Sequence, residues 1–191
     1  MPKTLFINAC LRENSRTLEL ANHLLSVAFD GVEEVKLYES SLAPLDLKSM
    51  VIRDEASKSK DYSNPLFDFA KQFAAADVIV IAAPYWDLMF PAVLKSYLEN
   101  VTVAGITFCY SEQGCPRGLC KAKSLYYVTT SGGFIGQNDF GFSYVKALAQ
   151  NFFEINKIHR YSAEGLDIFG TDVETVMQRA KIKIESDTQK L

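Results

Sequence analysis

Hydroxyl and guanidinium side chains gather in one stretch near the start of the chain. Residues 8–17 read Asn-Ala-Cys-Leu-Arg-Glu-Asn-Ser-Arg-Thr and follow a short apolar run. Ser15 and Thr17 can donate hydrogen bonds, and Arg12 or Arg16 can add positive charge beside the free N–H groups of a helix start. This combination suits a phosphate monoester, although the stretch contains neither a P-loop nor a GxGxxG motif. The alternative is that its polar side chains only cap the helix that follows.

A second stretch, residues 83–91, is rich in aromatic side chains. It reads Ala-Pro-Tyr-Trp-Asp-Leu-Met-Phe-Pro and contains the only tryptophan of the chain. A loop bounded by prolines can offer apolar contact along a flat ring such as a flavin and backbone groups at its polar edge. The alternative is an aromatic plug that packs against a neighbouring helix or subunit.

A third stretch, residues 129–134, contains paired glycines in the order Thr-Thr-Ser-Gly-Gly-Phe. Paired glycines let the backbone approach a ligand closely and present successive N–H groups. Such amides can face the pyrimidine edge of a flavin and stabilise negative charge there. The alternative is an ordinary tight turn.

These three stretches are separated by β-branched runs that alternate with helical patterns, which is typical of βαβ units and a mainly parallel sheet. Leu18, Ala21, Leu25 and Ala28 share one helical face, and Leu94, Leu98 and Val101 share another after Pro91. Further helices are expected near residues 64–76, 142–153 and 172–186. Two connections, 39–64 and 102–123, are long, and the second is expected to form a hairpin over a site. The expected strands are Thr4 to Ala9, Glu33 to Tyr38, Val78 to Ala83, Ser124 to Thr130, and Lys157 to Ser162.

The three stretches directly follow the first, third and fourth expected strands. In open α/β sheets, ligands bind beyond the carboxyl ends of the strands, where the strand order reverses. The sequence therefore predicts that the three loops meet at one site.

Composition excludes several other classes of protein. The chain has 191 residues, as expected for a single domain over residues 1–191, and its net charge of −3 comes without a basic stripe for nucleic acid. No apolar run is long enough for a signal peptide or a membrane span. The four cysteines fit reduced thiols in a cytoplasm, and their spacing, with only two histidines, predicts no metal site.

Several short motifs also occur in a set order. Cys10-Leu11-Arg12 and Ser15-Arg16-Thr17 come first, followed by the Ala83 to Pro91 loop with Leu94-Lys95, then Thr107-Phe108-Cys109-Tyr110, Gly118-Leu119, Thr130-Ser131-Gly132-Gly133 and Ala163-Glu164-Gly165. With these motifs the chain resembles the FMN-dependent NADH:quinone oxidoreductase and azoreductase family over nearly its whole length.

The resemblance implies a flavodoxin-like, doubly wound sheet of five parallel strands in the order 2-1-3-4-5, with helices on both faces. It implies FMN as cofactor, NADH or NADPH as co-substrate, and a homodimer with sites at the interface. Tyr110 and Phe152 match positions of the substrate pocket and are expected to serve the neighbouring subunit. The implied FMN-binding residues are Arg12, Ser15, Thr17, Pro84, Tyr85, Trp86, Asp87, Leu88, Thr130, Ser131, Gly132 and Gly133.

Three residues depart from the family pattern. Asp87 stands where asparagine is usual, and a carboxylate beside a flavin disfavours its reduced anion unless it is protonated or paired. Ser131 replaces an arginine, and Cys10 replaces a serine. These departures leave the reduction potential and the acceptor preference open.

The expected activity is hydride transfer from NAD(P)H through FMN, by a ping-pong mechanism, to quinones, azo compounds or nitroaromatics. No catalytic side chain is required, because stacking and close approach suffice. The alternatives are a flavodoxin-type electron carrier, a protein without a cofactor whose aromatic loops pack a dimer, and oxidant sensing by Cys109, Cys115 and Cys120.

Overall fold

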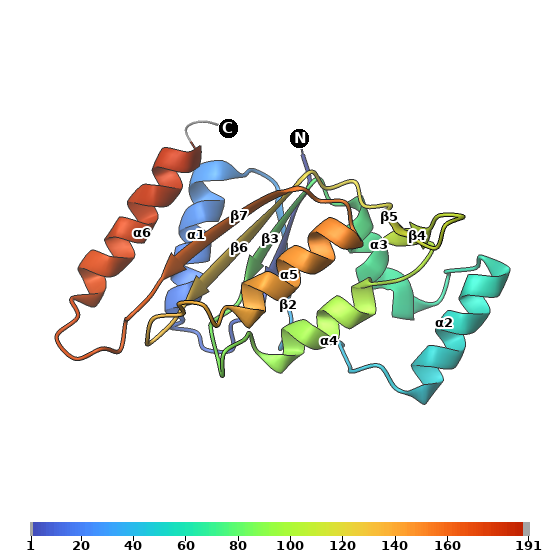
Figure 1. Cartoon of the computed structure of the whole chain (residues 1–191), viewed down its shortest axis with the longest axis horizontal. Coiled ribbons are helices and arrows are strands. Elements are labelled where there is room, and N and C mark those ends of the chain that lie inside the picture. The colour runs from blue at the N-terminus through green and yellow to red at the C-terminus, as the bar shows by residue number, and fades with distance from the viewer. Residues whose placement is uncertain (1, 189–191) are drawn as a thin grey trace.

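A five-stranded parallel sheet forms the centre of the computed structural model, which describes residues 2–188 (Figure 1). Its strand order, β2-β1-β3-β6-β7, is the flavodoxin-like order that the sequence predicted. The strands are β1 Thr4–Asn8, β2 Val32–Lys36, β3 Val78–Ala82, β6 Ser124–Thr130 and β7 Lys157–Ala163. The order reverses beside β1, so the carboxyl ends of β1 and β3 flank a crevice of the kind that holds ligands.

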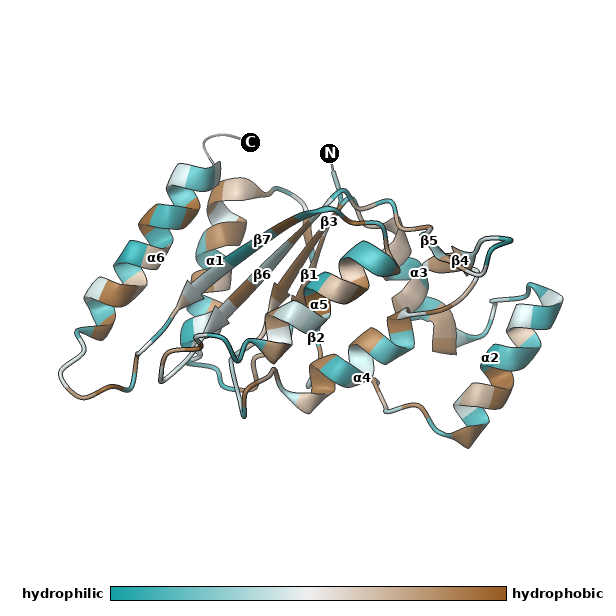
Figure 2. Ribbon diagram, in the orientation of Figure 1, coloured by the Kyte–Doolittle hydropathy of each residue, from teal (hydrophilic) through white to brown (hydrophobic). Residues whose placement is uncertain are grey.

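The alternating side chains of the central strands build two cores, one on each face of the sheet. Leu5 and Ile7 point to one core, and Phe6 between them points to the other. The central strand β3 is apolar along its length (Figure 2), as is typical of a parallel strand covered on both faces.

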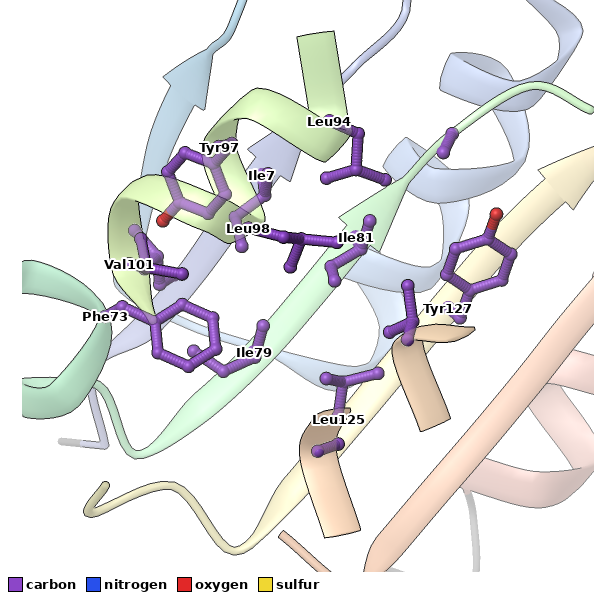
Figure 3. Packing of buried hydrophobic residues seen from close by; sticks show 14 of the residues in the cluster. Ile7, Phe73, Ile79, Ile81, Leu94, Tyr97, Leu98, Val101, Leu125 and Tyr127 are labelled. Carbon is purple, nitrogen blue, oxygen red and sulfur yellow. The ribbon is translucent and has the colours of Figure 1, made fainter. Parts of the chain in front are cut away.

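The helices fall into two layers around this sheet. The layer of α1 Arg16–Ala28 and α6 Val173–Thr188 packs on the Phe6 side. The layer of α3 Asp68–Ala75, α4 Ala92–Val101 and α5 Phe140–Asn151 packs on the other side, where Tyr97 and Leu98 of α4 meet Ile79 and Ile81 of β3 (Figure 3). None of the helices within residues 2–188 is long and apolar enough to cross a membrane.

The connection between β2 and β3 differs from the sequence prediction. It contains the helix α2 Leu47–Ser59, where a long loop was expected. Asp46 caps this helix by accepting a 2.7 Å hydrogen bond from the Ser49 N–H, yet Ala56 is its only buried residue. Because α2 has no continuous apolar stripe, its sequence lacks the helical periodicity that identified the other helices. The helix expected at 64–76 divides into a 3-10 turn, Pro65–Phe67, and α3.

The expected hairpin is present but lies elsewhere. The strands β4 Phe108–Tyr110 and β5 Pro116–Gly118 pair in antiparallel fashion. A side chain on Gly118 would clash with the backbone of Phe153, which follows the carboxyl end of α5, so the hairpin packs tightly there. That place is away from the carboxyl ends of β1, β3 and β6 of the same chain (Figure 1), so a position of the hairpin over a site stays a prediction that concerns a neighbouring subunit.

Candidate active site

A pocket of about 320 Å³ lies at the carboxyl ends of β1, β3 and β6. The three loops that the sequence singled out meet in it, joined by the loop that follows β7. Its lining residues are Leu11, Arg12, Asn14, Ser15, Arg16, Thr17, Pro84, Tyr85, Trp86, Thr130, Ser131, Gly132, Leu166 and Asp167.

The start of α1 forms one end of the pocket. Ser15 is the cap of α1, and its Oγ accepts a hydrogen bond from the Leu18 N–H at 3.3 Å. The N–H groups of Arg16 and Thr17 have no partner within residues 2–188, and both residues line the pocket. Capping and anion binding are therefore compatible, because the Ser15 side chain caps the start of the helix while the next two amides remain available to a ligand.

The hydroxyl of Thr17 was expected to donate a hydrogen bond to a phosphate, but in the structure it bonds to another side chain. Its side chain is buried, and its Oγ1 shares a 2.6 Å hydrogen bond with Oγ1 of Thr130 at the end of β6. The contact ties the first turn of α1 to the glycine turn, Ser131-Gly132-Gly133, which follows β6.

The two arginines of the first loop differ in their contacts. Arg16 donates from Nη1 to the carbonyl of Leu166 at 3.1 Å and pairs through Nη2 with the Asp167 carboxylate at 2.7 Å. Arg12 is exposed, lines the pocket and forms no ion pair within residues 2–188. Arg12 therefore provides the side-chain charge that is available at this end of the pocket.

The aromatic loop makes a tight turn at its tip. Trp86 and Met89 exchange two backbone hydrogen bonds of 2.9 and 2.8 Å, and the residues between them, Asp87 and Leu88, have φ angles of 49° and 69°. Two positive φ angles at these places are typical of a type I′ turn, which favours Asn-Gly rather than Asp-Leu. The turn holds Trp86 against the pocket, while Asp87 and Leu88 stand at its tip and do not line it.

Tyr85 anchors the same loop to its neighbours. Its N–H donates to the carbonyl of Thr130 at 3.0 Å, and its hydroxyl donates to the carbonyl of Asn138 at 2.8 Å. The aromatic loop and the segment after β6 are thus joined as one wall of the pocket.

The glycine turn is held by its carbonyl groups. The N–H groups of Gly165, Leu166 and Asp167 donate to the carbonyls of Gly133, Ser131 and Gly132, at 3.1, 3.1 and 2.9 Å respectively. The amides of the two turn glycines have no partner in the part of the chain that the structure describes. Successive free amides of this kind form an anion-binding concavity.

Glu164 supports this region from behind. One carboxylate oxygen accepts a hydrogen bond from the Ile135 N–H at 3.0 Å. The other accepts from Arg160 at 2.9 Å and from the Ser162 hydroxyl at 3.0 Å. The Ala163-Glu164-Gly165 motif therefore braces the segment that follows the glycine turn.

Most of the residues expected to bind FMN line this one pocket. Asp87, Leu88 and Gly133 are the exceptions, although each belongs to a loop that does. Four further lining residues were not among the predicted site residues: Leu11, Asn14, Leu166 and Asp167. The last two directly follow the Ala163-Glu164-Gly165 motif after the fifth strand, and that motif is the signal that could have identified them.

Tyr110 and Phe152 lie outside this pocket. Both pack edge-on against the ring of Phe108, with centroid distances of 5.3 and 5.0 Å. Tyr110 is 59% exposed and lines a second, more apolar cavity of about 500 Å³ between α2, α4, α5 and the hairpin.

The cysteines are all free. Burial raises the pKa of the Cys10 thiol to about 11 and that of Cys120 to about 12. Both are thus protonated at neutral pH, which disfavours thiolate chemistry at these two positions.

Known proteins share this fold. A family model described as a flavodoxin-like fold matches residues 2–187. An FMN-dependent NADH:quinone oxidoreductase of Lachnoclostridium phytofermentans is 36% identical, with 96% of each chain covered. A protein of Clostridium acetobutylicum, FMN-dependent NADH:quinone oxidoreductase 2, is 31% identical over 93% of this chain and 94% of its own. The crystal structure of an azoreductase from Bacillus anthracis str. Sterne has a TM-score of 0.88 at 25% identity and covers 100% of both chains.

The fold and the position of the pocket define a flavodoxin-like α/β protein. The chain belongs to the family of FMN-dependent NADH:quinone oxidoreductases, as its motifs indicated.

Proposed function

We propose that this protein is an FMN-dependent oxidoreductase that passes hydride from NADH or NADPH to quinones or azo compounds. The observation that carries the proposal is one pocket with two sets of free amides and an aromatic wall between them. One set belongs to Arg16 and Thr17 at the start of α1, and the other to Gly132, which lines the pocket, and to Gly133, which follows it in the same turn; Trp86 lies in the wall.

The residues of the pocket fit FMN. The free amides of α1, with Arg12 beside them, suit a phosphate monoester. The amides of Gly132 and Gly133 suit the polar edge of the ring system, and the side chains of Tyr85 and Trp86 suit its apolar faces. FMN supplies hydride acceptance and donation when it is bound.

The chain's own residues then bind the flavin and the substrates, orient them, and exclude water from the pocket. Tyr85 is fixed by hydrogen bonds at its amide and its hydroxyl, so it can hold a flat ligand in one orientation. Positioning of this kind converts an encounter of two reactants into a reaction within one complex. No acid or base side chain is assigned, and the donor and the acceptor are expected to occupy the same open face in turn.

The proposal also concerns the domain organisation of the chain and its assembly. Residues 1–191 are proposed to form a single FMN-binding domain that acts in the cytoplasm. A second copy is proposed to cover the cavity beside Tyr110, which Met50 of α2 also lines. Leu47 and Val51 of the same helix are exposed apolar side chains as well. Tyr110 and Phe152 would then face the partner's acceptor site.

A flavodoxin-type electron carrier is not favoured, because the relatives are named for NADH:quinone turnover. Steady-state kinetics test the proposal. Protein loaded with FMN should oxidise NADH or NADPH with a water-soluble quinone, and double-reciprocal plots at several quinone concentrations should be parallel. Intersecting lines would contradict the proposal that donor and acceptor occupy the same face in turn. An absence of turnover with both nucleotides would contradict the enzymatic function.

A further inference from the structure

Arg16 connects the two ends of the pocket rather than serving one of them. It is the first residue of α1, and it reaches the loop after β7 with two nitrogens. Nη1 donates to the carbonyl of Leu166, and Nη2 pairs with the carboxylate of Asp167. A cation that is already paired with a carboxylate attracts a phosphate less strongly than a cation without such a partner.

The loop that Arg16 holds also determines the position of the glycine turn. The N–H of Leu166 donates to the Ser131 carbonyl, and the N–H of Asp167 donates to the Gly132 carbonyl. With its carbonyls engaged in this way, the turn keeps its two glycine amides without a partner among the described residues. Displacement of Leu166 and Asp167 would therefore reorient the amides that are proposed to meet the ring.

The turn and the loop also lie close together. A side chain on Gly132 would clash with the carboxylate of Asp167, so the turn and the loop touch without intervening space. The Arg16–Asp167 ion pair itself is partly solvent-exposed, with side-chain exposures of 38% and 65%. Exposed pairs contribute little to global stability, so we expect its effect to be local.

We propose that Arg16 is a positioning residue: it holds the Leu166–Asp167 loop, and through that loop the glycine turn, while Arg12 supplies the side-chain charge for the phosphate. This inference rests on the proposed function, because it assigns roles around a bound FMN. It predicts that the two neighbouring arginines affect flavin binding in different ways.

The test compares FMN with riboflavin, which lacks the phosphate. The apo-protein is titrated with each flavin by fluorescence, and the ratio of the riboflavin Kd to the FMN Kd measures the contribution of the phosphate. Arg12→Gln should lower this ratio about tenfold by weakening FMN alone. Arg16→Gln should weaken both flavins by a similar factor, about three- to tenfold, and leave the ratio unchanged.

Asp167→Asn provides the matched variant on the other side of the ion pair. It should reproduce the effect of Arg16→Gln, and the double variant should be no weaker than either single one, because the two residues act as a unit. Arg16→Lys should restore part of the affinity for both flavins. Thermal unfolding of each apo-variant shows whether the fold is retained.

A second readout is the flavin reduction potential. It should become more negative in Arg16→Gln and in Asp167→Asn, since displaced amides stabilise the reduced form less, and should stay closer to wild type in Arg12→Gln. A fall in the Kd ratio for Arg16→Gln, or selectively tighter FMN binding by Asp167→Asn, would overturn the positioning role. An unchanged ratio for Arg12→Gln would overturn the role of Arg12. A wild-type protein that binds neither flavin would instead refute the proposed function itself.

Discussion

The hydroxyl groups of Thr17 and Thr130 lie 2.6 Å apart in the interior and join the first turn of α1 to the end of β6. The contact fixes the distance between the proposed phosphate end of the pocket and the glycine turn. It also explains why Thr17 is buried although its neighbours Ser15 and Arg16 are only partly so.

Replacing either hydroxyl should leave the other without its partner. Thr17→Val or Thr130→Val should lower the free energy of unfolding by about 1–3 kcal/mol, since an unpaired buried hydroxyl is costly. The double variant should lose less than the sum of the single ones, because it leaves no unpaired hydroxyl. Urea unfolding of the four proteins measures the coupling, and strictly additive losses would show that the contact is unimportant.

The two turn glycines should respond differently to an added methyl group. Gly132→Ala places a Cβ against the Asp167 carboxylate, whereas a Cβ on Gly133 meets nothing within 4 Å. Gly132→Ala should lower the melting temperature of the apo-protein by about 2–4 °C for each kcal/mol of strain. Gly133→Ala, the matched control, should change it by less.

Asp167→Ala introduced into Gly132→Ala should recover part of the lost stability, because it removes the clashing carboxylate. Equal melting temperatures for the two alanine variants would contradict the close packing of this turn against the loop after β7.

Leu88 should be a site where a change to glycine does not destabilise the protein. Its φ of 69° is left-handed, which disfavours a residue with a side chain by about 1 kcal/mol, and half of its surface is already exposed. Leu88→Gly should therefore leave the free energy of unfolding unchanged or raise it by up to about 1 kcal/mol. Leu119 is similarly exposed without a positive φ, so Leu119→Gly should be destabilising. A larger loss for Leu88→Gly than for Leu119→Gly in urea unfolding would contradict the strained turn.

The apolar face beside Tyr110 should be a dimer contact. Met50→Glu and Tyr110→Glu each place a charge on this face and should shift the protein toward the monomer in analytical ultracentrifugation. Phe134→Glu is a suitable control, because Phe134 is also exposed but follows the glycine turn. A monomeric wild-type protein, or dissociation by the Phe134 variant alone, would contradict the proposed interface.

The strands could be predicted because short β-branched and aliphatic runs depend on their own residues, while the strand order came from the resemblance to a known family. Val78 to Ala82 is such a run, and its place at the centre follows from burial on both faces. The helix α2 could not be predicted in this way. It buries only Ala56, so its sequence has no amphipathic stripe.

The site was predictable where its residues follow strands directly, as the loops after β1, β3 and β6 do. Asp167 was not, because its importance comes from a contact with Arg16, 151 positions earlier in the chain. The pairing of Thr17 with Thr130 is likewise a contact between distant segments, and a hydroxyl that binds a ligand cannot be distinguished in sequence from one that joins two segments.

The pocket at the carboxyl ends of the strands is proposed to hold FMN and to let NAD(P)H reduce it. The most direct measurement is the visible absorption spectrum of the protein after FMN addition and desalting, followed by anaerobic addition of NADH or NADPH and then of a quinone. We expect a retained yellow flavin that bleaches with nucleotide and regains its colour with quinone. A flavin that is lost on desalting, or one that neither nucleotide reduces, would contradict it.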